Sequence, residues 1–217
     1  MEIILIGDGG HSKVIQDIII AENKHKIVAV LDEKYLGIHK ENGIIYGPFT
    51  NLNQLNNQDS RVLIAIGNNQ IRKKIVREIK LDENQFISVI HPSAIISPSA
   101  KIAPGTVVMP NAVINANAVI HSHCIINTGV IVEHDCTIFN YSHLSPRVTL
   151  TGNVTVGEGA NIGAATTAIP GVTIGEWSVI GAGATVIRDI PGYQKAVGCP
   201  AKVMNAEVQV QPLKGGV

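Results

Sequence analysis

Aliphatic residues recur at every sixth position from Ile90 to Val186 without a change of register. An α-helix repeats every 3.6 residues and an ordinary strand every two, so neither produces a strict period of six. A parallel β-helix does, because each hexad supplies one short strand and its turn and stacks on the next coil. Small or β-branched residues follow four places after each aliphatic, from Ala94 to Ala184. The pattern predicts a parallel β-helix over residues 86–191.

Residues 1–85 follow a different pattern, in which strands alternate with helices. Residues 2–6, 26–31 and 61–66 are apolar and predict strands, while a stretch through Ile15 and Ile18 and the charged residues 71–80 predict helices. This alternation is typical of a Rossmann-like βαβ domain with a parallel sheet. Residues 34–60, rich in Asn and Gly, predict a looser connection. The hexad register ends near residue 192, so residues 192–217 are expected to form a capping loop and a tail.

The composition limits the partners of the chain. Its 217 residues carry 17 basic and 17 acidic side chains, which predicts no nucleic-acid partner. No apolar run approaches the roughly 20 residues that span a bilayer, and the first residues lack the basic region of a signal peptide. We therefore expect no membrane insertion. The three cysteines, Cys124, Cys136 and Cys199, fit a reducing cytoplasm better than a disulfide framework.

A glycine-rich segment, Gly7-Asp8-Gly9-Gly10-His11-Ser12, joins the first predicted strand to the first helix. Such a loop lets the backbone approach a phosphate at the helix N-terminus. Asp32, at the end of the second strand, has the spacing used to bind a ribose hydroxyl. The motif favours a nucleotide but does not decide between NAD and a nucleotide sugar, although so short a domain argues against NAD. The alternative is a tight turn followed by a solvated acid.

His134 is the candidate catalytic residue of the β-helix, because it lies between Glu133 and Asp135. An imidazole beside a carboxylate can accept a proton near neutral pH, since the negative charge stabilises the imidazolium. With three hexads per coil, residues 18 apart stack. Gly152 is then placed directly above His134, where its N–H could serve as an oxyanion donor. The alternative is a surface histidine in a turn.

Two further features of the repeat have both a functional and an ordinary interpretation. His121 and His123 form a His-x-His pair, but a metal site needs a third converging ligand. We favour solvated turn residues there and expect no metal. Gly163-Ala164 should stack beneath Gly181-Ala182 as a strip with little side-chain bulk, against which a long thin ligand could lie. Small residues are also common in hexad repeats, so the strip alone is weak evidence.

Several longer segments carry a family resemblance. They are Gly7-Asp8-Gly9-Gly10-His11, Leu31-Asp32-Glu33, Ile64-Ala65-Ile66-Gly67-Asn68-Asn69, Asn127-Thr128, Val132-Glu133-His134-Asp135-Cys136, Ser142-His143 and Val197-Gly198-Cys199-Pro200-Ala201-Lys202. Over almost its full length the chain resembles hexapeptide-repeat sugar acetyltransferases with an N-terminal nucleotide-sugar domain. It looks most similar to the sialic-acid O-acetyltransferases (NeuD-like) and the UDP-4-amino-sugar N-acetyltransferases of the bacillosamine pathway (PglD-like).

The resemblance implies a left-handed β-helix and a homotrimer, with acetyl-CoA lying between neighbouring solenoids. It implies a general base at His134 supported by Asp135, a position where the bacillosamine enzymes tend to carry Glu. The other implied positions are Gly9, Gly10, His11, Asp32, Glu33 and Gly67 for the UDP-sugar, and His143, Ala164 and Ala182 for acetyl-CoA.

The expected activity is cytoplasmic N-acetylation of the 4-amino group of a UDP-linked amino sugar, of the UDP-4-amino-4,6-dideoxy-N-acetylglucosamine type. Acetyl-CoA is the expected co-substrate, transfer is direct, and the product would enter glycan or exopolysaccharide biosynthesis. Three alternatives stay open. The first is O-acetylation of sialic acid or another sugar hydroxyl. The second is a γ-type carbonic anhydrase with zinc between subunits, and the third is a solenoid without catalytic activity.

Overall fold

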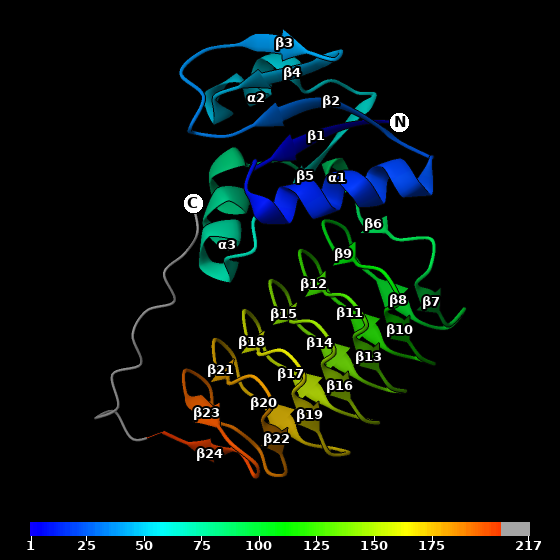
Figure 1. Ribbon diagram of the computed structural model, residues 1–217, viewed down its shortest axis with the longest axis vertical. Coiled ribbons are helices and arrows are strands. Elements are labelled where there is room, and N and C mark those ends of the chain that lie inside the picture. Colours follow the sequence, from blue (N-terminus) through cyan, green and yellow to red (C-terminus); the bar gives the residue numbers. More distant parts are fainter. Residues whose placement is uncertain (205–217) are drawn as a thin grey trace.

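The computed structural model describes residues 1–204, which form an N-terminal α/β domain seated on a long β-helix (Figure 1). The α/β domain has one sheet of strand order β3-β4-β2-β1-β5. Its main elements are β1 (Glu2–Ile6), α1 (Gly10–Glu22), β2 (Lys26–Leu31), β5 (Ser60–Ile64) and α3 (Asn69–Ile79). Strand β1 pairs in parallel with β2 and β5, so the predicted Rossmann-like βαβ arrangement is confirmed.

The ends of β5 and α3 differ slightly from the prediction. Strand β5 ends at Ile64, two residues early, because the chain turns there toward the loop that precedes α3. Helix α3 begins at Asn69, two residues early, because the Asn68 side chain accepts a hydrogen bond from Ile71 N at 3.0 Å and so caps the helix.

The expected loose connection at 34–60 is wrong in part, because this segment contains regular structure. It holds β3 (His39–Glu41), β4 (Ile44–Gly47), the 3-10 turn η1 (Phe49–Asn51) and α2 (Leu52–Leu55). Strand β4 is parallel to β2, and β3 is antiparallel to β4 through a turn at Asn42 and Gly43, both with positive φ. Asn-Gly between two short strands is a recognised hairpin signal. The outer strand β3 is exposed throughout, so it lacks the alternation that marks a half-buried strand.

The β-helix is left-handed, as expected, and has three sheets whose strands are parallel except for β24. The first sheet contains β6 (Val89–Ile90), β9 (Val107–Val108), β12 (Ile125–Ile126), β15 (His143–Leu144), β18 (Asn161–Ile162), β21 (Val179–Ile180), β23 (Lys195–Val197) and β24 (Lys202–Val203). The second contains β7 (Ile95–Ile96), β10 (Val113–Ile114), β13 (Ile131–Val132), β16 (Thr149–Leu150), β19 (Thr167–Ala168) and β22 (Thr185–Val186). The third contains β8 (Lys101–Ile102), β11 (Val119–Ile120), β14 (Thr137–Ile138), β17 (Thr155–Val156) and β20 (Thr173–Ile174).

Residues 18 apart lie side by side on neighbouring coils, as in the pair Val113 and Ile131. The second residue of most strands points inward, so that Val132, Ile138 and Leu144 are fully buried. We call the turns from the first sheet to the second the first corner, those from the second to the third the second corner, and those from the third back to the first the third corner. The second corner is therefore opposite the first sheet.

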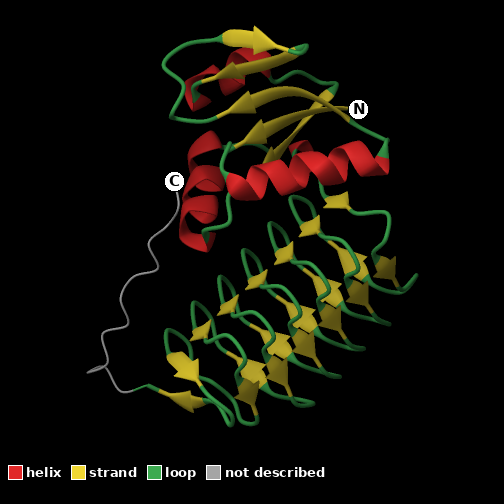
Figure 2. Ribbon diagram, in the orientation of Figure 1, coloured by secondary structure: helices red, strands yellow, loops and turns green. Residues whose placement is uncertain are grey.

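The α/β domain packs on the first sheet, and Figure 2 shows helix α1 between the α/β sheet and the β-helix. Helix α3 stands at the side, and its apolar residues pack on the other face of the α/β sheet. Ile15 and Ile18 of α1 share a buried cluster with Val107 and Ile125, whose side chains leave the outer face of the first sheet. The two parts thus share a hydrophobic contact, and the first sheet is the face of the β-helix that the α/β domain covers.

The last coil is shorter than the others. Strand β23 pairs with β21 at a spacing of 16 residues, Val179 with Lys195, and β24 then returns antiparallel to β23. The segment expected to be a capping loop from residue 192 includes both strands, and the expected tail, 205–217, lies outside the described residues. In residues 1–204, no helix is both long and apolar enough to cross a membrane.

Candidate active site

His134 and Asp135 form a hydrogen-bonded pair at the second corner, between β13 and β14. Asp135 has a φ of 60°, and its Oδ2 lies 2.8 Å from His134 Nδ1. Asn117, one coil earlier, donates from Nδ2 to Asp135 Oδ1 at 3.1 Å. The hydrogen bond from His134, and after it the one from Asn117, lowers the pKa of the Asp135 carboxyl. The carboxylate occupies Nδ1, so Nε2 is the imidazole atom left to accept a proton.

Gly152, one coil later, lies over the same imidazole. A Cβ built on Gly152 would be 2.6 Å from both Nε2 and Cε1 of His134. Its backbone N–H makes no hydrogen bond within residues 1–204. Proline, which has no N–H, occupies the equivalent place in other hexads: Pro92, Pro98, Pro104, Pro110, Pro146 and Pro170. The coils therefore do not need this N–H, and at Gly152 it is free to bind a substrate oxygen.

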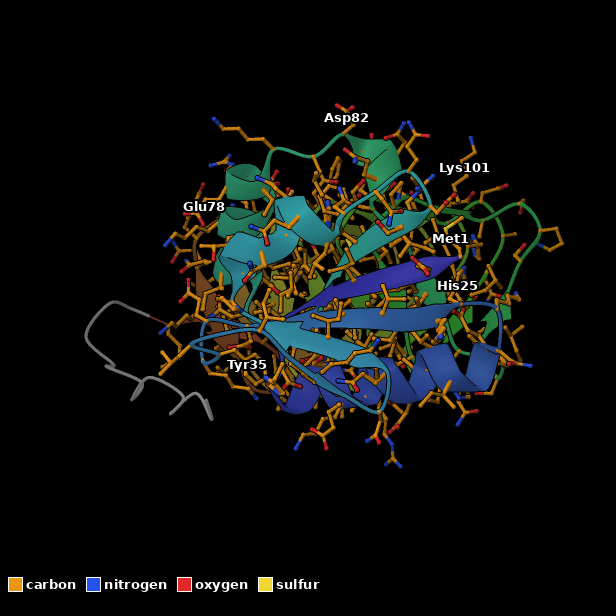
Figure 3. The ribbon with its side chains drawn as sticks, turned by 90° about the horizontal axis from the view of Figure 1, so that it is seen from above. Met1, His25, Tyr35, Glu78, Asp82 and Lys101 are labelled. Atoms are coloured by element: carbon orange, nitrogen blue, oxygen red, sulfur yellow. The ribbon has the colours of Figure 1, made fainter. Side chains whose placement is uncertain are left out.

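The second candidate site is a cavity of about 290 Å³ at the carboxyl edge of the α/β sheet. Asp32, Glu33, Phe49 and Lys74 are among its lining residues. Figure 3 shows Glu78, another lining residue, on the side of the domain away from Met1 and His25. Ligands of open α/β sheets bind at this edge, where neighbouring strands connect in opposite directions.

The glycine loop borders this cavity, and its glycines differ in what the fold demands of them. Gly7 has a φ of 108°, and a Cβ there would be 2.7 Å from Ile66 Cγ1, so only glycine fits. Gly9 and Gly10 have nothing within 4 Å of an added Cβ and leave open space at the start of α1. The Asp32 carboxylate accepts from the backbone N–H of Asp8 at 2.7 Å and so braces the loop.

A polar network beside the loop escaped the sequence analysis. Lys34 Nζ lies 2.6 Å from Asp8 Oδ2, and Tyr35 donates its hydroxyl to the same oxygen at 2.5 Å. Burial raises the pKa of Asp8, but the hydrogen bonds from Lys34 and Tyr35 outweigh it and hold that pKa below its usual value. Lys34 and Tyr35 follow the acidic pair directly in sequence, but nothing in their spacing indicates that they reach back to Asp8.

His11, Gly67 and His143 meet where the α/β domain contacts the β-helix. The rings of His11 and His143 are 6.4 Å apart, and His143 Nε2 lies 3.1 Å from Asn127 Nδ2. Burial, and then the charge of Arg72, lowers the pKa of His143 to about 3 and that of His11 to about 4. Both imidazoles are therefore neutral at pH 7. His143 lies on the first sheet, so one chain does not bring it together with His134.

The strip of small residues is continuous and lies at the first corner. A Cβ on Gly163 would be 2.5 Å from Ala182 N, and Gly183 N donates to Ala164 O at 2.8 Å. Ala182 is exposed and Ala164 half-buried. Within one chain, this strip and the His134 pair are at different corners of the β-helix.

His121 and His123 each stack on an aromatic ring of the next coil, and His123 is buried, so the expectation of a solvated turn residue is wrong for His123. His121 is parallel to Phe139 with ring centroids 4.9 Å apart, and His123 is parallel to Tyr141 at 5.3 Å. Across residues 1–204, no three His, Cys, Asp or Glu side chains gather where they could hold a metal ion.

Comparison with known proteins identifies the family. The PglD N-terminal domain model matches residues 2–79. A crystal structure of perosamine N-acetyltransferase from Caulobacter crescentus, in complex with CoA and GDP-perosamine, is 37% identical, with a TM-score of 0.86. That likeness covers 94% of this chain and 97% of the other. The chain belongs to the PglD-like family of sugar N-acetyltransferases. The expected family, fold and acetyl-CoA-dependent acyltransferase class are confirmed.

Two further relatives agree with this result. The acetyltransferase domain of PglB from Neisseria gonorrhoeae, in complex with acetyl coenzyme A, is 35% identical over 94% of this chain and 98% of that chain, with a TM-score of 0.85. UDP-N-acetylbacillosamine N-acetyltransferase of Bacillus subtilis (strain 168) is 45% identical over 95 residues. That alignment spans 43% of this chain and 44% of the Bacillus protein, less than half of its length.

Proposed function

We propose that this chain transfers the acetyl group of acetyl-CoA to the 4-amino group of a UDP-linked amino sugar, of the UDP-4-amino-4,6-dideoxy-N-acetylglucosamine type. More broadly, it is a sugar N-acetyltransferase acting on nucleotide-linked amino sugars. The relatives support this activity, since the Caulobacter enzyme binds CoA and GDP-perosamine and the Bacillus relative is named for a UDP-linked sugar. The reaction would occur in the cytoplasm and feed glycan biosynthesis.

The observation that carries the proposal is the packing of His134 between Asp135 and Gly152. The sugar amine, in its neutral form, attacks the thioester carbonyl carbon, and a C–N bond forms as the C–S bond breaks. His134 Nε2 takes the proton that the amine loses and can return it to the departing thiolate. Asp135 stabilises the imidazolium, and the Gly152 N–H binds the oxyanion. Base assistance of this kind contributes about 10²- to 10⁴-fold.

The nucleotide sugar is assigned to the cavity at the carboxyl edge of the α/β sheet. Asp32 and Glu33 line it, and Gly9 and Gly10 leave the N-terminus of α1 open for the diphosphate. We assign His11 and Gly67, which lie where the α/β domain contacts the β-helix, to the sugar end of the ligand. The acetyl-CoA arm is assigned to the first corner, where it would lie along Ala164 and Ala182. His143, on the adjoining first sheet, would lie beside it.

The corner geometry supports a homotrimer in which sites are shared. His134 is at the second corner, opposite the first sheet, whereas the α/β domain, His143 and the Ala164–Ala182 strip belong to the first sheet and first corner. One chain therefore points its base away from its own nucleotide domain. A neighbouring copy that presents its second corner to this first corner would complete the site, with acetyl-CoA between the two solenoids.

The proposal is tested by thiol release from acetyl-CoA with a panel of acceptors. We expect turnover with UDP-4-amino sugars, weaker turnover with GDP-perosamine, and none with sialic acid. Turnover with sialic acid alone would show that the protein acetylates a sugar hydroxyl and not a sugar amine. His134→Ala should lower kcat by at least about 10²-fold while light scattering shows an intact trimer. An unchanged kcat would remove His134 as the base.

A further inference from the structure

Arg72 is a buried cation that joins the two parts of the molecule. It leaves α3 with only 1% of its surface exposed, and no carboxylate within residues 1–204 pairs with it. A guanidinium has five N–H donors. All five are used: Nε donates to His123 O at 2.8 Å, one terminal nitrogen to Ile66 O and Gly67 O at 3.0 and 3.2 Å, and the other to Asn69 Oδ1 and Tyr141 O at 2.9 and 2.7 Å.

The solenoid acceptors are carbonyls that the coils themselves leave free. At the third corner, the coil-to-coil hydrogen bonds use the preceding residue, since Tyr141 N donates to Ser122 O and Gly159 N to Asn140 O. The carbonyls of the left-handed turn residues His123, Tyr141 and Gly159 are not used in this way. Arg72 binds the first two, and Asn69 Nδ2 donates to Gly159 O at 3.1 Å.

These carbonyls mark the boundaries of the coils that hold the reactive groups. One complete turn of the solenoid runs from His123 to Tyr141 and carries His134 and Asp135. The next turn runs from Tyr141 to Gly159 and carries His143 and Gly152. On its other side, Arg72 binds the Ile66–Gly67 loop, and Ile66 lines the proposed nucleotide cavity.

We propose that Arg72, supported by Asn69, is the positioning residue that sets the register of the nucleotide-binding domain along the solenoid axis. Equivalent carbonyls repeat on successive coils about 4.8 Å apart, the usual spacing of paired strands. The apolar contact between α1 and the first sheet is non-directional and does not select one coil strongly. The rigid fork of Arg72 binds the carbonyls of two successive coils at once and so opposes displacements smaller than the coil spacing, whereas a Lys side chain cannot span both.

The inference rests on the proposed function, because a shifted domain would misplace the acceptor amine relative to the thioester. A misplacement of about 1 Å can cost about 10²-fold in rate. Arg72→Lys should therefore lower kcat at least about tenfold, while KM for each substrate stays within about threefold because neither pocket loses a contact. Asn69→Ala releases the Gly159 and Ala160 carbonyls and one of the acceptors of Arg72, but it keeps the Arg72 contacts to His123 and Tyr141, so it should have a smaller effect in the same direction. Arg77→Lys, an exposed arginine of the same helix, is the matched control and should leave kcat unchanged.

A second measurement does not depend on activity. Titration of the ring signals by NMR should give a pKa of about 4 for His11 and about 3 for His143 in the parent. Both pKa values should be higher in Arg72→Lys, because a loosened contact between the domains admits water to the rings while the positive charge is kept. If the unmutated protein showed no acetyl transfer, the proposed function would be wrong. The titration would still test whether Arg72 holds the nucleotide-binding domain on the solenoid. The inference would be overturned by an intact Arg72→Lys trimer that keeps the parental kcat or the parental titrations of His11 and His143. If Arg72→Lys does not fold, a parental kcat in Asn69→Ala would overturn it.

Discussion

Gly152 and His134 occupy the same place in successive coils, and the glycine lies so close that its missing side chain defines the position of the imidazole. An added Cβ would be 2.6 Å from His134 Nε2, whereas real Cβ atoms stay beyond about 3 Å. The ring is thus held by Asp135 at one edge and covered by the bare backbone of Gly152 near Nε2.

Gly152→Ala tests this arrangement. The added methyl group would displace the imidazole from Asp135, so we expect kcat to fall by about 10²-fold or more. The inward residues of this coil are untouched, so the melting temperature of the trimer should change little. Gly37→Ala is the control, because a Cβ at Gly37 meets nothing within 4 Å. A parental kcat in Gly152→Ala would show that the His134 imidazole does not act as the base in the position that the structure gives it.

Asp135→Asn removes the charge that stabilises the imidazolium but keeps the shape of the side chain. We expect a milder loss of kcat than for His134→Ala. Asn117→Ala removes only the support of Asp135 and should lower kcat less than Asp135→Asn does. Steady-state kinetics measures both variants. A parental kcat in Asp135→Asn would contradict the pairing.

Asp32→Ala should weaken the nucleotide sugar selectively. It removes a lining carboxylate and the brace on Asp8 N, so KM for the sugar should rise severalfold more than KM for acetyl-CoA. Steady-state kinetics with each substrate varied in turn measures the split. Equal increases in both KM values would show that the two substrates do not use separate parts of the molecule.

Ala182→Leu should weaken the binding of acetyl-CoA selectively, whereas Asp32→Ala weakens the binding of the nucleotide sugar. The new side chain adds bulk at an exposed place on the first corner, while Ile180 and Ala184 keep the core unchanged. KM for acetyl-CoA should rise with little change for the sugar, provided that light scattering still finds a trimer. If an intact trimer binds acetyl-CoA as the parent does, the strip is ordinary repeat packing.

The stability of the protein should fall as the pH is lowered from about 7 to 5. The pKa values of His11 and His123 are lowered to about 4 and that of His143 to about 3, in each case first by burial and then by Arg72. These histidines stay neutral when folded but bind protons near pH 6.5 when unfolded, so their contribution is complete above pH 6.5 and is lost below it. Urea midpoints measured across this range should decline. A constant midpoint from pH 7 to 5 would contradict the burial of these rings.

The sequence predicts the β-helix well, because one residue in six must face a narrow interior and the period survives every coil. The same period predicts the contact between His134 and Gly152. It cannot predict that His143 faces the α/β domain rather than His134, or that Arg72 reaches His123 and Tyr141. Those contacts depend on which face of the solenoid receives α1 and α3, and no local pattern encodes that choice. The hairpin of β3 and β4 was missed for another reason, since its exposed outer strand has no apolar alternation and only Asn42-Gly43 marks it.

The antiparallel strand β24 also has a consequence for how the protein behaves at high concentration. A stack of identical parallel coils has no intrinsic length, and its open end could accept a coil from another molecule and grow into a fibre. The shortened last coil places β23 on the stack, and β24 then reverses direction along it. An incoming parallel coil meets a two-residue strand that runs the wrong way, so the chain carries its own terminator of polymerisation.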